Sequence, residues 1–447
     1  MIPARRGACP SLAAPMQTGD GLLARINPLG GIAPAAFAGL CAAAQRHGNG
    51  VIEVTQRGNI QVRGLSDASA PLFAEEFGAL GIPNATGAAM TTNALAGLDP
   101  SEVIDGSVLL NQLRDALDAT DLPSRLDAKV SVVVDGGGAM HLDALKADVR
   151  LGALDHPSGV LWHLAVPGTA EESTPLGAIA PEHAPETVIH LLQVIASHGP
   201  NARARDVLRC DRGAGFRNAI GNDLLHVPPP PKRPAAEPIG IHALRKGVAL
   251  GIGLAFGSDA KTLIDLANVA ADAGATEIRS APGRTLLIVG LSAVAADHLR
   301  TFAEHLGFVV RADDPRRHIA ACAGAPVCGS GEIATRALAP QIAEAAASLF
   351  DGSLQVHVSG CRKGCAHAGR AALTIVGMQG RCGIVINGSP LDFPVAEISP
   401  QALPESLTRL AGEIEASSVA GERAAGVLMR LGHARIAAAL MGEPVRA

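Results

Sequence analysis

Two stretches of the chain repeat one arrangement of apolar and polar positions. Each has a short apolar run, a longer run of helical period and two more short apolar runs, which predicts strand, helix, strand, tight turn and strand. The stretches 21–65 and 247–291 align without a gap at an offset of 226, which places Gly21 on Gly247. Similarity at a fixed offset predicts an internal duplication, and a chance match of common apolar patterns is the alternative.

The remaining segments follow mixed patterns. Strand-like KVSVVVDG and VLWHLAV and the helical PETVIHLLQVIASHG lie before the middle of the chain, and a comparable set lies near its end. Between them, HVPPPPKRPAAEP has four consecutive prolines, which favour an extended connector. The sequence therefore predicts a duplicated, pseudo-two-fold α+β fold with a half-domain at 15–80, an α+β domain at 85–225, a linker at 226–238, a second half-domain at 239–308 and a second α+β domain at 315–445.

The composition narrows the classes of function. The 447 residues are 48% hydrophobic, carry a formal net charge of −5, and include no Tyr and a single Trp, Trp162. Neither a basic face nor aromatic stacking platforms are indicated, so we expect no nucleic-acid partner. The N-terminal segment lacks the apolar core of an export signal, and no uninterrupted apolar run is long enough to cross a membrane. We therefore expect a cytoplasmic protein without a membrane span.

The cysteines give the strongest chemical signal. Cys322 and Cys328 enclose AGAPV, and Cys361 and Cys365 enclose RKG. In a long cytoplasmic chain, such close pairs are more typical of metal ligands than of disulfides. The other four cysteines lie singly in the sequence, and we expect them to be small buried residues: Cys9, Cys41, Cys210 and Cys382.

The two cysteine pairs predict a 4Fe–4S cluster. An iron–sulfur cube needs four thiolates from converging loops, and small neighbours such as Gly324 and Gly360 let backbone N–H groups approach its sulfides. Structural zinc and cysteines that bind no metal are the alternatives. Zinc loops prefer roughly two to four intervening residues, whereas the first pair encloses the five residues AGAPV.

The order C-AGAPV-C and then SG-C-RKG-C, after duplicated half-domains, resembles the sulfite/nitrite reductase superfamily over nearly the whole chain. The resemblance implies two ferredoxin-like half-domains, two mixed α/β sulfite/nitrite-reductase-type domains, and a tetrapyrrole beside the cluster. TQRGNIQVRGL is similar to the superfamily strand whose arginine meets tetrapyrrole carboxylates, which implies Arg57 with Arg63 nearby. Guanidinium groups pair bidentately with carboxylates and stay protonated. Solvated arginines at a strand end are the alternative.

Two further segments resemble anion-binding stretches of that superfamily. NALAGLDP implies a substrate-binding role for Asn93, and LPSRLDAKV implies one for Arg125. The match is incomplete, because Thr92 stands where an arginine usually precedes the asparagine. Asp127 falls near the second lysine of the other motif, which leaves Lys129 as its substitute. The anion contacts are therefore expected to be rearranged.

The second cysteine pair indicates one branch of the superfamily. It encloses Arg362 and Lys363 where sirohaem reductases usually have Pro-Asn, and SGCRKGCAHAG with RRGACPSLAAPMQTGDGLL resembles the precorrin-3B synthase branch. The resemblance implies that precorrin-3A replaces sirohaem, with Arg362 and Lys363 binding its carboxylates. It further implies dioxygen as co-substrate, an electron donor of unknown identity, C20 hydroxylation and γ-lactone formation in aerobic cobalamin biosynthesis.

The resemblance also implies a mononuclear non-haem iron. Histidines and carboxylates suit such a centre, but the fifteen histidines form no local ligand pattern. His367, two residues after Cys365, is the candidate catalytic residue, as a ligand, a proton donor or a hydrogen-bonding partner of one. An ordinary structural hydrogen bond is the alternative for His367. His141 is the other candidate.

Two other functions stay open at this point. A sirohaem-dependent sulfite or nitrite reductase would share the cluster, and bound sirohaem absorption would identify it. A non-catalytic electron-transfer or tetrapyrrole-binding protein would show unaltered cluster spectra and no product on adding precorrin-3A, since fold alone does not fix function.

Overall fold

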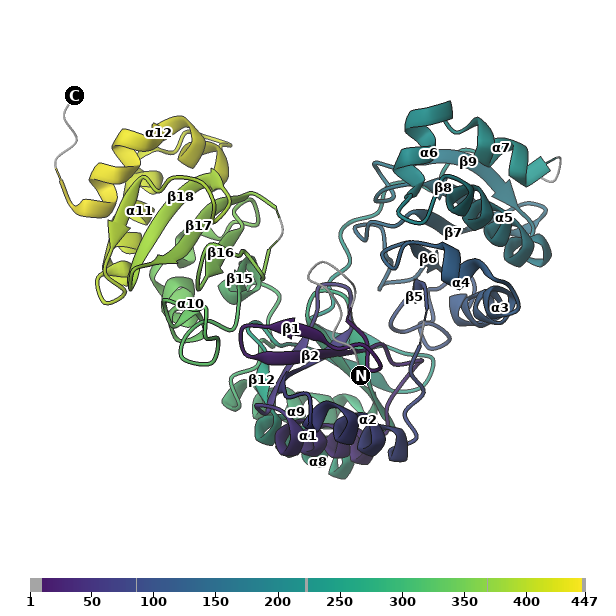
Figure 1. Ribbon diagram of the computed structural model, residues 1–447, viewed down its shortest axis with the longest axis horizontal. Helices are drawn as coiled ribbons and strands as arrows, with labels where there is room; N and C mark the ends of the chain where they lie inside the picture. The colour runs from purple at the N-terminus through teal and green to yellow at the C-terminus, as the bar shows by residue number, and fades with distance from the viewer. Residues whose placement is uncertain (1–9, 86, 222–223, 368, 444–447) are drawn as a thin grey trace.

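The computed structural model describes residues 10–85, 87–221, 224–367 and 369–443. Cys9 and the start of the N-terminal motif lie outside the described residues, as do the last residues of the predicted second α+β domain. Figure 1 shows three lobes, a base formed by both half-domains and one arm on either side of it. The predicted fold class is confirmed, because the elements of this α+β chain occur twice in one order.

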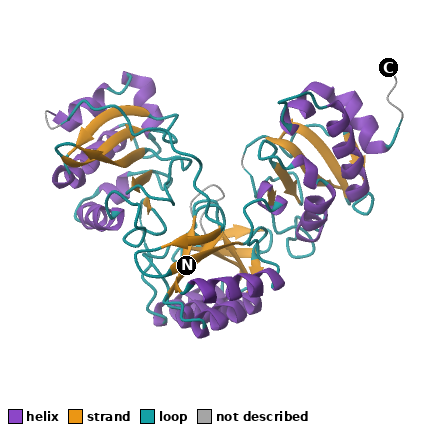
Figure 2. Cartoon of the chain, turned by 180° about the vertical axis from the view of Figure 1, so that it is seen from behind, coloured by secondary structure: helices purple, strands orange, loops and turns teal. Residues whose placement is uncertain are grey.

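Each half-domain of the base is an antiparallel sheet covered by helices. The sheets have the orders β1-β2-β4-β3-β12 and β10-β11-β14-β13. Figures 1 and 2 show the helices on the side that faces away from the arms. The first half-domain comprises β1 (Met16–Thr18), β2 (Gly21–Ile26), α1 (Pro34–His47), β3 (Val51–Val54), β4 (Ile60–Leu65) and α2 (Ser69–Ala79). The second comprises β10 (Gly240–Ala243), β11 (Val248–Gly253), β12 (Ser258–Asp259), α8 (Ala260–Asp272), β13 (Glu277–Ala281), β14 (Thr285–Leu291) and α9 (Ala293–His305).

The two half-domains pair reciprocally. β12 places Ser258 against Ile52 of β3, and Ile32 forms a bridge to Ile278 of β13. The two contacts are equivalent under the duplication. At the offset of 226, Ile32 corresponds to Ser258 and Ile52 corresponds to Ile278. The helices α1 and α8 pack together in one core that both halves share. The duplication is therefore visible in the pairing of the strands as well as in the sequence.

Each arm is a five-stranded mixed sheet with helices. Both sheets follow the order of the chain, with two parallel pairs and then two antiparallel pairs. The first arm, residues 89–220, comprises β5 (Ala89–Thr92), α3 (Gly106–Asp118), α4 (Leu122–Arg125), β6 (Ser131–Asp135), β7 (Val149–His156), β8 (Gly159–Val166), β9 (Thr174–Ile179), a 3₁₀ turn (Pro181–His183), α5 (Ala184–Ser197), α6 (Ala204–Asp211) and α7 (Ala214–Ile220).

The second arm, residues 315–441, repeats this plan. Its second strand is buried on both faces like that of the first arm, as expected for parallel strands covered on both sides. Its elements are a 3₁₀ turn (Pro315–His318), β15 (Ile319–Ala321), α10 (Thr335–Ala345), a 3₁₀ turn (Ala347–Leu349), β16 (Val356–Ser359), β17 (Ala371–Met378), β18 (Arg381–Gly388), β19 (Ala396–Ile398), α11 (Leu403–Ser417) and α12 (Ala424–Met441).

Among the described residues, α12 is the one helix with the length and apolarity of a membrane span. Its backbone departs from helical geometry at Gly432, where φ is 74°. Val427 and Leu428 before this break and Ile436 and Leu440 after it are fully buried in the core of the second arm. The helix thus packs as a core element of a folded domain, and its composition is weak evidence for a span.

The Pro-rich linker has neither helix nor strand, and its charged residues attach it to the first arm. Arg233 donates through Nη2 to Asp135 over 2.7 Å and through Nε to Asp143 over 3.0 Å. Pro234 accepts a 2.7 Å contact at its carbonyl from Nε2 of His141. The neighbouring Lys232 pairs with Glu171, and both of these side chains are mostly exposed.

Arg233→Ala is expected to destabilise the first arm by about 2 kcal/mol, because it removes the ion-pair partner of buried Asp135. Lys232→Ala is the matched control. It removes an exposed pair that contributes at most about 1 kcal/mol. Calorimetric melting of the two variants measures the difference, and equal melting temperatures would contradict a clamping role for Arg233.

Candidate functional site

The two cysteine pairs follow neighbouring strands of the second arm. β15 ends directly before Cys322, and β16 ends two residues before Cys361. The two strands are parallel, with Ala321 opposite Val358. Since the carboxyl ends of parallel strands lie at the same edge of a sheet, the topology brings the two cysteine loops together.

Hydrogen bonds join these two loops. The N–H of Gly360 donates to Sγ of Cys322 over 3.1 Å, and the N–H of Glu332 donates to the carbonyl of Gly360 over 2.7 Å. Lys363 adds a side-chain bond from Nζ to Oγ of Ser330 over 2.6 Å. Backbone N–H donors to sulfur are a regular feature of iron–sulfur sites.

The site leaves little room for larger residues. A Cβ on Gly360 would lie 3.0 Å from Cα of Gly324 in the first cysteine loop, and one on Gly19 would lie 2.2 Å from Sγ of Cys328. Gly19 lies in the turn between β1 and β2, so the first half-domain also lines the site. No disulfide joins the four cysteines, of which Cys365 is exposed and the others are half-buried. Four sulfur donors on closely packed backbone loops fit an iron–sulfur cluster.

The first arm repeats this loop geometry with an amide in place of a thiol. Asn93 directly follows β5 as Cys322 follows β15, and its Oδ1 accepts the N–H of Gly136 over 2.8 Å. Its Nδ2 donates to Asp135 and to two backbone carbonyls. The sequence predicts that Asn93 binds the substrate. Both polar atoms of the Asn93 side chain form hydrogen bonds that hold the loop after β6. Substrate binding by Asn93 stays a prediction, and no contact in the structure supports it.

Arg63 lies in a buried ion network rather than at a pocket rim. Its Nε and Nη2 donate to the two carboxylate oxygens of Asp20 over 2.8 and 2.7 Å, and its Nη1 lies 3.3 Å from Glu53. Burial alone would raise the pKa of Asp20, but the hydrogen bonds and charge of Arg63 outweigh it and hold that pKa below its ordinary value. Glu53 also pairs with Arg336 of α10, which joins the first half-domain to the second arm.

The other predicted cations are divided between the lobes. Arg57 is half-buried and donates from Nη2 to the carbonyl of Lys146, which links the first half-domain to the first arm. Arg125 is exposed on α4 and pairs with Asp121. Figure 1 shows α4 in the first arm, whereas the cysteine loops follow strands of the second. Of the five predicted cations, Lys363 and the exposed Arg362 therefore lie in the second cysteine loop. Arg63 is held in ion pairs, Arg57 lies at the junction with the first arm, and Arg125 lies within the first arm.

His367 packs against a second histidine that sequence reasoning missed. The rings of His367 and His357 are edge to face, with their centroids 5.7 Å apart. His357 lies in β16 and is fully buried, and this burial, with a contribution from His367, lowers its pKa to about 4. The available sequence signal was a histidine inside the apolar strand-like run VHVS.

His141 belongs to a different cluster. Its ligand nitrogen and the carboxylates of Asp135 and Asp143 lie within 4.8 Å of one another. Both carboxylates already pair with Arg233, and Nε2 of His141 lies against the carbonyl of Pro234. The linker therefore balances the charge of this cluster.

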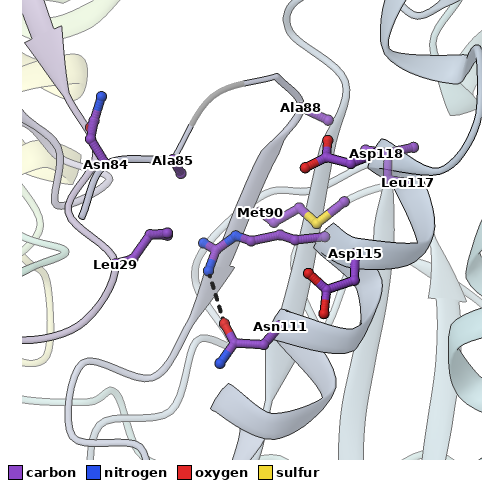
Figure 3. Close-up of a pocket in the computed structure, with 10 residues that line it drawn as sticks. Leu29, Asn84, Ala85, Ala88, Met90, Asn111, Asp115, Leu117 and Asp118 are labelled. Atoms are coloured by element: carbon purple, nitrogen blue, oxygen red, sulfur yellow. Dashed lines mark hydrogen bonds between the residues drawn. The ribbon is translucent and has the colours of Figure 1, made fainter.

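A small pocket lies apart from these groups. Figure 3 shows Leu29, Asn84 and residues of α3 around it, and Nη1 of Arg114 lies 3.4 Å from Oδ1 of Asn111. Burial lowers the pKa of Arg114. The cavity measures about 240 Å³, which is below the roughly 300–1,000 Å³ of typical small-molecule sites. It includes none of the predicted site residues, so we do not assign the macrocycle to it.

The base, the duplicated arms and the cysteine loops define a protein of the sulfite/nitrite reductase fold. Residues 14–80 match the nitrite/sulfite reductase ferredoxin-like half domain. The solved structure of Mycobacterium tuberculosis NirA protein resembles this chain with a TM-score of 0.72 and 19% identity, covering 93% of this chain and 84% of that one.

A curated relative narrows the class further. Precorrin-3B synthase of Sinorhizobium sp is 41% identical over 439 residues, which span 97% of this chain and 94% of the relative. The chain belongs to the precorrin-3B synthase family.

Proposed function

We propose that this protein converts precorrin-3A to precorrin-3B in aerobic cobalamin biosynthesis, in the cytoplasm. The reaction hydroxylates C20 of the macrocycle and closes a γ-lactone from the ring A acetate. The observation that carries the proposal is the 41% identity to a precorrin-3B synthase over nearly the full length of both chains. One oxygen atom of dioxygen enters the product and the other leaves as water, which requires two electrons and two protons from a donor.

The cysteine loops support a redox role within this proposal. We assign Cys322, Cys328, Cys361 and Cys365 as ligands of a 4Fe–4S cluster, which supplies one-electron transfer when bound. The Gly360 N–H, which lies 3.1 Å from Sγ of Cys322, stabilises the negative charge on that sulfur.

Cationic side chains beside the cysteines are suited to a polycarboxylate macrocycle. Arg362 and Lys363 lie in the second cysteine loop and are exposed, and Arg57 lies at the junction of the base and the first arm. We assign carboxylate recognition to these three residues, because guanidinium and ammonium groups attract carboxylates and the guanidinium fork also orients them. We also assign His367, which follows Lys363 by four residues, to contact with the same ligand.

Anaerobically purified, cluster-replete protein tests the proposal when it is incubated with precorrin-3A and a chemical reductant, with and without isotopically labelled dioxygen. The expected product is heavier by one labelled oxygen atom, and only in the presence of dioxygen. Absence of that mass gain would overturn the proposal. Bound sirohaem in the purified protein would instead favour a sulfite or nitrite reductase.

A further inference from the structure

His357 occupies the centre of the second arm's parallel strands. It lies in β16, opposite Ala320 of β15 and Thr374 of β17. Its neighbours Val356 and Val358 belong to the core beneath the helices. Because side chains alternate along a strand, His357 points to the opposite face of the sheet. Its side chain is nonetheless completely buried.

Neither ring nitrogen of His357 has a hydrogen-bond partner among the described residues. The adjacent hydroxyl of Thr374 donates elsewhere, to the carbonyl of Gly388 over 2.8 Å. A buried polar group without a partner is destabilising, and such groups in native proteins call for an explanation such as an ion.

The duplicated arm shows that the fold does not need a histidine at this position. Val133 of β6 lies two residues before Asp135, as His357 lies two residues before Ser359 at the end of β16. Val133 is completely buried as well. An apolar residue therefore satisfies the packing at the equivalent position. The histidine in the second arm is explained by a chemical role rather than by the packing of the sheet.

His367 provides a second imidazole at a suitable separation. Its ring centroid lies 5.7 Å from that of His357, at an interplanar angle of 63°. Two imidazoles that bind one ion through nitrogens about 2 Å from the metal have centroids roughly 5–6 Å apart. The other contact of His367 is weak, since its Nε2 lies 3.3 Å from the carbonyl of Arg370. The separation of the two rings is thus the one expected when two imidazoles share an ion.

We propose that His357 and His367 together bind one divalent transition-metal ion beside the cysteine loops. Neutral imidazole suits Fe²⁺, Co²⁺ and Zn²⁺. The ligand pair rests on the geometry alone, whereas the choice of iron as the native ion rests on the proposed function. The same loop then carries cysteine ligands of the cluster and one ligand of the mononuclear ion.

Iron and acid-labile sulfide per chain, with Mössbauer spectra of protein enriched in isotopic iron, test this site without any substrate. Wild-type protein reconstituted anaerobically with Fe²⁺ and desalted is expected to hold one iron more than its sulfide accounts for. His357→Val uses the residue that the first arm accepts at this position, and His367→Asn changes only a loop side chain. Both are expected to lower the extra iron at least about tenfold, with sulfide unchanged. His433→Ala, at an exposed histidine of α12, is the control.

The outcomes separate this site from the proposed reaction. No extra iron in the wild type, or extra iron that persists in both variants, would overturn the metal site even if the oxygen-dependent mass gain is found. Sulfide that falls together with iron in both variants would also overturn it, because the histidines would then support the cluster. Extra iron that both variants lose, without any product from precorrin-3A, would keep the metal site and remove the proposed reaction.

Discussion

Serine in place of Cys361 is expected to leave the second arm folded and to remove its iron–sulfur cluster. Cys361 follows the buried strand β16, and its loop is held by hydrogen bonds that do not use its sulfur. An alkoxide is a poor substitute for a thiolate at iron, so we expect iron and sulfide per chain to fall at least about tenfold. Oxygen insertion into precorrin-3A is expected to be lost with them. Visible absorbance, sulfide analysis and product mass measure these changes.

Cys210→Ser is the matched control for this substitution. Cys210 lies on α6 of the first arm and is isolated in the sequence. It is exposed, so the expectation that it is a small buried residue is wrong. Its replacement is expected to change neither the cluster content nor the product yield. Normal cluster content in Cys361→Ser, or an equal loss of cluster in both variants, would contradict the assignment of Cys361 and Cys365 as cluster ligands.

Asp20→Asn is expected to destabilise the base lobe by about 3 kcal/mol, because it leaves buried Arg63 with Glu53 as its remaining counter-charge. The side chain of Asp20 is only 1% exposed and that of Arg63 only 13%, so solvent screens the pair weakly. A loss of this size lowers the melting temperature by at least about 5 °C in a domain of ordinary size. Scanning calorimetry of the cluster-replete protein measures it.

The pKa of Asp20 sets the pH range of the same effect. The pKa of Asp20 in the folded protein lies below its ordinary value. The ion pair therefore contributes its full stability at any pH above the ordinary pKa, and this stability is lost as the pH falls from there through the folded-state pKa. The difference in melting temperature between wild type and Asp20→Asn should therefore shrink in acid. Asp67→Asn is the control, because Asp67 is exposed in the same half-domain and its replacement is expected to cost less than about 0.5 kcal/mol. Identical melting of the Asp20 and Asp67 variants would contradict the prediction.

Much of the fold could be predicted from local pattern. The repeat anchored on Gly21 and Gly247 predicted equivalent strands and helices, because apolar periodicity and turn residues act over short distances. Both glycines have positive φ at equivalent turns, 107° and 71°. The two-residue strand β12 and the bridge of Ile32 to Ile278 were not predictable, because such short contacts have no period and depend on how the halves dock.

The candidate site was predictable where its residues are neighbours in sequence. Each cysteine pair lies within one loop, and parallel pairing of β15 and β16 then brings the loops together. Arg63 was assigned to the substrate because its partner Asp20 is 43 residues away in sequence. His357 was overlooked because a histidine in a buried strand has an ordinary structural explanation until its unpartnered nitrogens are visible.

Asn93 and Cys322 hold the same place in two copies of one frame, and each accepts the N–H of the glycine after the adjacent strand. The backbone at this turn is therefore alike in the two arms, although one arm presents a thiol there and the other an amide. If the thiol binds a cluster as proposed, the equivalent loop of the first arm is held by protein hydrogen bonds alone. The two-fold symmetry of the backbone then does not extend to its chemistry.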